Sequence, residues 1–74
     1  MNEKLANKMK EAYPPGTRIE LISMDDPWAP VASGTRGTVR MVDDAGTIHM
    51  KWDNGRMLGL ILEVDEFEII KEVK

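Results

Sequence analysis

The sequence predicts a small all-β barrel or roll preceded by an N-terminal helix. Apolar and polar residues alternate in most of the chain, and glycines stand where the chain must reverse. The clearest reversal is Asn54-Gly55, because Asn-Gly between two alternating apolar runs is a strong hairpin signal. The length of 74 residues allows one domain near the lower limit for a self-sufficient core. We therefore expect a single domain, with a helix in residues 1–13 and the barrel in residues 14–74.

The spacing of apolar residues predicts that the helix covers residues 2–13, with Asn2 as its N-cap. The residues that recur at helical spacing are Leu5, Met9, Ala12 and Tyr13. Pro14-Pro15-Gly16 ends the helix, because proline removes a backbone donor and restricts the residue before it. An isolated helix of this length is marginal in water, so we expect it to dock on the barrel.

Five strands are expected after the helix. Their ranges are 17–24, 37–43, 48–52, 56–62 and 66–70. In the second strand, Val39 and Met41 are expected on one face. The connection from Asp25 to Thr35 is long, and long loops on small β scaffolds often carry function.

A two-residue turn at Asn54-Gly55 would set the register of the central hairpin. In that register Trp52 faces Met57 and Ile48 faces Ile61, and these residues form an apolar face with Trp52 in the core. The opposite face would then carry an exposed apolar row made of Leu58, Leu60 and Leu62. We expect the N-terminal helix to cover this row, and a second copy of the chain is the alternative.

Composition excludes several function classes. The chain has no cysteine and one histidine, His49. It therefore lacks the residues needed for thiol chemistry and for a histidine-rich metal site. Thirteen acids against ten bases give a net charge of -3, which disfavours non-specific nucleic-acid binding. The acids are concentrated near the C-terminus, so the net charge does not exclude a local basic patch on the barrel. We find no membrane span or signal peptide, and expect a cytoplasmic protein without cofactor or metal.

From Tyr13 to Ile70 the chain resembles the domain of unknown function 4314 family, found in bacteria, phages and mobile elements. The matching motifs are Pro15-Gly16-Thr17-Arg18, Glu20-Leu21-Ile22, Met24-Asp25-Asp26-Pro27, Gly34-Thr35-Arg36-Gly37-Thr38-Val39, Asp43-Asp44, Gly46-Thr47-Ile48-His49, Trp52-Asp53-Asn54-Gly55 and Leu58-Gly59-Leu60-Ile61. The resemblance implies an SH3-like small barrel in a phage or mobile-element setting, and it implies no activity. The family pattern has a glycine near Leu62-Glu63, where this chain has none, and tends towards proline at Val31 and Ala32.

Two groups of residues are candidate binding sites. Trp28 lies between prolines in the long loop, where it serves either as an exposed binding anchor or as a plug for the barrel end. The second group is a set of cations on the outer face of the second and third strands, which could receive a phosphate: Arg36, Arg40, His49 and Lys51. Scattered solvated charges on an exposed strand face are the commoner explanation of such a set.

Two further readings of the charged residues are weaker. Asp25 and Asp26 could meet Asp43 and Asp44 around a hard cation, but aspartate more often caps turns with its own backbone. His49 next to Asp44 or Asp43 could be imagined as a general base, but no serine, cysteine or second acid has matched spacing, so we expect no enzyme.

The leading hypothesis is therefore a non-enzymatic binding module that acts through protein–protein contact. It rests on Trp28 and on the exposed row that contains Leu58 and Leu60. The second hypothesis is recognition of a phosphate-bearing ligand, either single-stranded nucleic acid or a signalling nucleotide, by the cation set. The third is self-assembly into a homo-oligomer through the leucine row.

Overall fold

The computed structural model describes residues 3–25 and 30–70. One helix, α1, covers Glu3–Ala12. The strands are β1 (Arg18–Ser23), β2 (Arg36–Val42), β3 (Thr47–Trp52), β4 (Leu60–Ile61) and β5 (Glu66–Ile69). The mainly β class and the N-terminal helix are thus confirmed, whereas the fourth strand is much shorter than expected.

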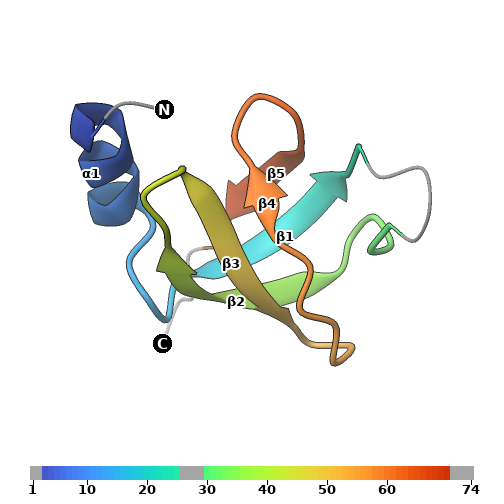
Figure 1. Cartoon of the computed structure of the whole chain (residues 1–74). Coiled ribbons are helices and arrows are strands. Elements are labelled where there is room, and N and C mark those ends of the chain that lie inside the picture. The colour runs from blue at the N-terminus through green and yellow to red at the C-terminus, as the bar shows by residue number, and fades with distance from the viewer. Residues whose placement is uncertain (1–2, 26–29, 71–74) are drawn as a thin grey trace.

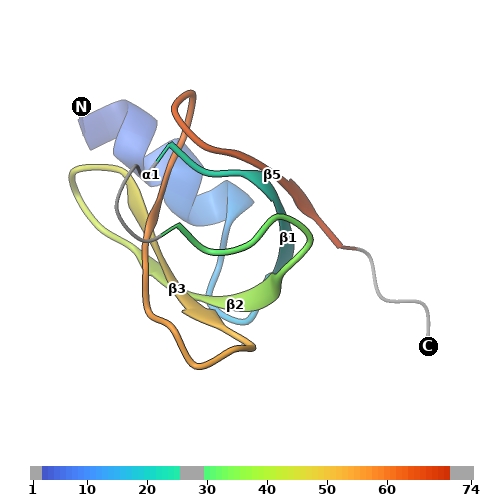
Figure 2. The ribbon, with the colours of Figure 1, turned by 90° about the vertical axis from the view of Figure 1, so that its right-hand side faces the viewer.

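The strands form one antiparallel sheet in the order β4-β3-β2-β1-β5. The sheet curls, as the two views in Figures 1 and 2 show. Its edge strands, β4 and β5, do not pair with each other in the part of the chain that the structure describes. The sheet is therefore open, and the barrel closure that the sequence suggested is not observed.

The core lies on the concave face of the curled sheet. Its largest fully buried side chains come from four strands: Ile19, Leu21, Val39, Ile48, Met50, Trp52 and Leu60. In β1 the alternation of Ile19 and Leu21 with Arg18 and Glu20 follows the period of two that the sequence predicts. Trp52 is confirmed as a core residue, and its indole Nε1 donates a hydrogen bond to the Leu58 carbonyl at 2.7 Å.

A β-bulge in β2 changes which residues of that strand face inward. Val39 pairs with Met50, but Met41 pairs with His49, so Arg40 is the extra residue. Val39 and Val42 are consequently buried, while Met41 is 49% exposed. The prediction that Val39 and Met41 share one face was wrong, because strict alternation takes no account of a bulge.

The central hairpin also departs from its predicted register. The Gly55 N–H donates to the Trp52 carbonyl at 2.9 Å, and the Trp52 N–H donates to the Arg56 carbonyl at 2.8 Å. Gly55 has a φ of 91°, whereas Asn54 is not among the described residues with positive φ. A two-residue type I′ turn needs positive φ at both positions, so the chain instead forms a three-residue loop with glycine in the left-handed conformation.

This loop shifts the register by one residue and pairs Ile48 with Leu60. A shift of one residue exchanges the two faces of a strand. Leu60 is therefore fully buried, whereas Ile61 is 51% exposed and Met57 is exposed as well. The predicted exposed row therefore does not form: Leu62 is exposed as expected, but Leu60 is buried and Leu58 is half-buried.

The helix docks elsewhere than expected. Ala6 and Met9 are its buried residues, and Met9 belongs to the core cluster. The helix packs against β2, beside the turn from β2 to β3, where Lys10 Nζ lies 2.5 Å from Asp44 Oδ1. Leu5 is exposed, contrary to its place in the predicted apolar set. No helix in the described ranges has the length and apolar character needed to cross a membrane.

Candidate functional site

An apolar pocket opens where β1 ends and the chain turns from β4 to β5. It has a volume of about 210 Å³, and its lining residues are Met24, Asp25, Leu58, Gly59, Ile61, Val64 and Asp65. Met24 and Leu58 pack against the core, whereas Ile61 and Val64 are 51% and 49% exposed. Contiguous apolar side chains that stay accessible are characteristic of contact surfaces.

The buried carboxylate of Asp65 connects two of the segments that line this pocket. Its Oδ1 accepts a hydrogen bond from the Asp25 N–H and its Oδ2 accepts one from the Ile61 N–H, each at 2.9 Å. The Asp65 N–H in turn donates to the Ile61 carbonyl at 2.9 Å. One carboxylate, only 9% exposed, thus joins the end of β1 to the end of β4.

Glu63, which directly precedes the lining residue Val64, has an unusual backbone conformation. Its φ is 73°, in the left-handed region that favours glycine. The sequence resemblance places a glycine near this position, and the observed conformation explains that preference. This chain instead has an exposed carboxylate in the turn between Ile61 and Val64.

The sequence pointed to only part of this site. Leu58, a predicted contact residue, lies in the pocket wall, while Leu60 is buried beneath it and cannot touch a partner directly. Ile61 was missed because the predicted register turned it inward, and Val64 was missed because it lies between the fourth and fifth predicted strands. Trp28 lies outside the described residues, so its proposed role as anchor or plug stays a prediction.

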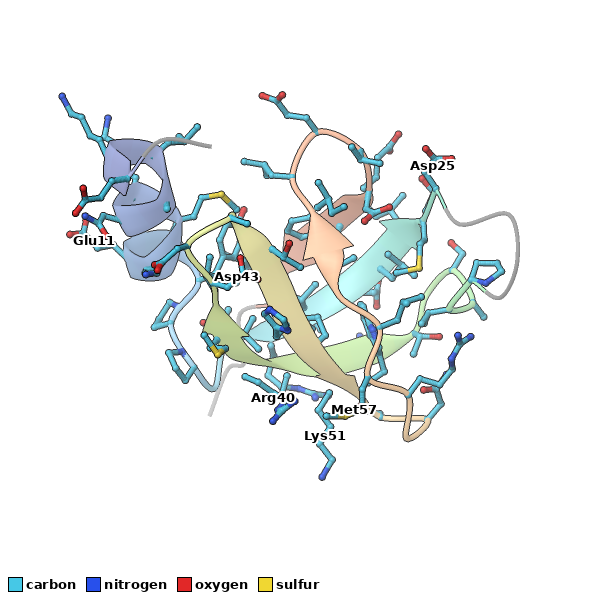
Figure 3. All side chains as sticks on the ribbon, viewed as in Figure 1. Glu11, Asp25, Arg40, Asp43, Lys51 and Met57 are labelled. Atoms are coloured by element: carbon cyan, nitrogen blue, oxygen red, sulfur yellow. The ribbon has the colours of Figure 1, made fainter. Side chains whose placement is uncertain are left out.

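Of the four predicted cations, two lie next to an acidic side chain and two do not, among the described residues. Arg36 Nε lies 3.1 Å from Glu20 Oε1, and His49 Nε2 lies 2.8 Å from Asp43 Oδ2. Arg40 and Lys51 are exposed, and among the described residues neither has an ion-pair partner. Figure 3 places Arg40 and Lys51 on the lower side of the molecule in that view.

Arg18 is a further cation on the same face of the sheet. Its Nη1 and Nη2 donate to Asp53 Oδ1 and Oδ2 at 2.8 and 2.7 Å, and Nη1 also donates to Thr38 Oγ1 at 2.9 Å. The hydrogen bonds from Arg18 hold the pKa of Asp53 below its ordinary value of 3.8. Acids therefore neutralise much of the positive charge on this face.

His49 and Asp43 stabilise the turn between β2 and β3. Asp43 Oδ1 accepts hydrogen bonds from the backbone N–H groups of Ala45 and Thr47 at 3.0 and 2.9 Å. The hydrogen bond from His49, followed by that from Thr47, holds the pKa of Asp43 below 3.8. This is the turn chemistry of aspartate that the sequence favoured over metal binding.

The described acids do not gather around a cation site. Asp43 lies beside α1, and Asp25 lies at the opposite end of the molecule (Figure 3). Asp26 is outside the described residues. Within the described ranges, no three histidine, aspartate or glutamate side chains come together as metal ligands would.

Comparison with known proteins identifies a family without an assigned activity. Residues 2–70 match the family model described as Domain of unknown function (DUF4314). No curated protein matches the chain. No solved structure matches it either.

Proposed function

The chain belongs to the Domain of unknown function (DUF4314) family, and we propose that it is a non-enzymatic module that binds a protein partner. The contact surface is the apolar pocket beside Ile61 and Val64. An SH3-like scaffold and a cytoplasmic role for a phage or mobile element belong to the same proposal.

The observation that carries the proposal is the accessible apolar lining of the pocket. Ile61 and Val64 are each about half exposed although they adjoin core residues Met24 and Leu58. Burial of apolar area on binding contributes roughly 25 cal/mol per Å². A partner side chain seated there would remove this surface from water without rearranging the sheet, because Asp65 already fixes the pocket.

Affinity capture with the whole chain tests the proposal. The bait is compared with Ile61→Ser and with the control Met41→Ser, which changes a side chain of similar exposure on another strand. We expect a protein that the unchanged chain and Met41→Ser both retain and that Ile61→Ser loses. If every captured protein is retained equally by Ile61→Ser, the pocket is not the contact surface.

Recognition of a phosphate-bearing ligand is a second candidate, favoured by the cations Arg40 and Lys51, which are exposed and have no ion-pair partner in the part of the chain that the structure describes. Titration of an oligonucleotide and of a dinucleotide at low salt tests it. Binding that weakens steeply with salt and is lost in Arg40→Ala supports this function. Titrations that show no binding of either ligand exclude this function.

A further inference from the structure

We propose that the occupant of the pocket is a basic peptide segment of a partner protein. One apolar side chain of the segment enters the pocket, and neighbouring lysine or arginine residues meet the carboxylates at its rim. This inference rests on the proposed function and adds the chemistry of the partner.

The two chain segments that form the pocket contain no base. Neither residues 19–35 nor residues 57–70 include a lysine or an arginine. The acids of these segments are Glu20, Asp25, Asp26, Glu63, Asp65, Glu66 and Glu68. The net charge of the chain is therefore distributed unevenly, and the pocket lies in its acidic part.

Three acids make up what we call the rim: Asp25 lines the pocket, Glu63 directly precedes the lining residue Val64, and Glu66 directly follows the lining residue Asp65. Asp25, Glu63 and Glu66 are exposed, and the structure gives none of them an ion pair among the described residues. Acids on the outer face of the sheet differ in this respect, since Glu20 pairs with Arg36 and Asp53 pairs with Arg18.

Arg56, the base directly before the second of these segments (residues 57–70), has no carboxylate partner among the described residues. Arg56 Nη1 donates to the Pro30 carbonyl at 3.1 Å rather than to a carboxylate. A partner that supplies cations would relieve the repulsion among the rim acids, while an acidic partner or a nucleic acid would increase it.

The pocket is the right size for a side chain rather than for a cofactor. Its volume of about 210 Å³ falls below the roughly 300–1,000 Å³ of small-molecule sites. Its apolar walls, Leu58, Ile61 and Val64, select an aliphatic or aromatic group. Combined with the acidic rim, this predicts a short motif in which an apolar residue has basic neighbours.

Selection from a displayed random peptide library, with the whole chain as target, tests the inference. We expect enriched peptides to place lysine or arginine beside one apolar residue. A synthetic peptide of the enriched sequence should lose binding to Ile61→Ser. It should bind about fivefold more weakly to the double variant Asp25→Asn, Glu63→Gln, because exposed charge pairs are individually weak.

The matched control is Glu68→Gln, which removes one acid on β5 in register with Glu20. This variant should bind the peptide as the unchanged chain does. Thermal unfolding of each variant shows that it is folded under the conditions of the titration.

Three results would overturn the inference. In the first, the peptides lose binding to Ile61→Ser but are not enriched in lysine or arginine, and they bind the double variant as tightly as the unchanged chain. This result contradicts the inference and leaves the proposed function intact. Enriched peptides that bind Ile61→Ser normally contradict both. A peptide that binds Trp28→Ala but not the unchanged chain would mean that the chain's own tryptophan occupies the pocket.

Discussion

Trp52 and Gly37 show how single residues fix the packing of this small sheet. Trp52 is buried, and its indole is held by the hydrogen bond to the Leu58 carbonyl. Gly37 is paired with it across the β2–β3 ladder. A Cβ at Gly37 would lie 2.7 Å from Trp52 Cε3 and 3.0 Å from the Lys51 carbonyl oxygen.

Gly37→Ala should therefore lower the free energy of unfolding by about 1–3 kcal/mol, the usual cost of overpacking a core. Trp52 cannot move aside without losing its hydrogen bond to Leu58. Urea denaturation measures the effect. An unchanged midpoint would mean that the indole is not fixed as described.

Glu63→Gly should raise the free energy of unfolding by up to about 1 kcal/mol, because relief of the left-handed conformation outweighs the added freedom of the unfolded chain. The control Glu66→Gly changes the same residue type within β5, where glycine should cost about 1 kcal/mol. Thermal unfolding compares the two variants. Stability changes of the same sign would contradict the assigned backbone conformation of Glu63.

At the scale of elements, the β3–β4 hairpin decides which apolar residues reach the surface. Its three-residue loop buries Leu60 and exposes Ile61, and Asn54 Oδ1 accepts the Arg56 N–H at 3.0 Å to complete the turn. The exposed apolar wall of the pocket therefore follows from the type of one turn.

Leu60→Ser should destabilise the fold by about 3 kcal/mol or more, because it puts a hydroxyl and a cavity in the core. Ile61→Ser should cost less than about 1 kcal/mol, since its side chain is half exposed. Denaturant midpoints of the two variants test the register. If Ile61→Ser destabilised the fold more than Leu60→Ser, the result would contradict the observed register and support the two-residue turn.

The sequence predicted where the elements lie better than how they pair. Asn54-Gly55 located the hairpin, but Asn-Gly suits both a two-residue turn and a loop that ends in a left-handed glycine, and the choice depends on the φ of Asn54. The bulge at Arg40 likewise has no signal in the alternation of β2. Nothing in the sequence distinguishes Asp65 from the other acids near the C-terminus, because its two backbone donors come from distant segments, at Asp25 and Ile61.

At the scale of the whole molecule, charge is divided between two regions. The outer face of the sheet and the helix side contain ion pairs, as with Arg18 and Asp53 or Lys10 and Asp44. At the pocket end, the acids Asp25, Glu63 and Glu66 have no such partners within residues 3–25 and 30–70. This division separates the surface that stabilises the fold from the surface proposed to bind.

Acid should destabilise the protein in a defined range. The pKa values of Asp43 and Asp53 are lowered in the folded state, so the folded protein binds fewer protons than the unfolded chain. Their contribution to stability is complete well above pH 3.8 and is lost as the pH falls through the lowered values. Asp53→Asn should be less stable at neutral pH and should lose less stability on acidification. Melting temperatures between neutral pH and about pH 2 measure this, and parallel curves would contradict it.

The assignment of the pocket as the contact surface is tested most directly by amide chemical shifts during titration with the highest-affinity selected peptide. We predict that the largest changes occur at Leu58, Ile61 and Val64, and that Arg40 and Lys51 keep their positions. Changes centred on Arg40 and Lys51, with Ile61 unaffected, would contradict the account and move the binding site to the outer face of the sheet.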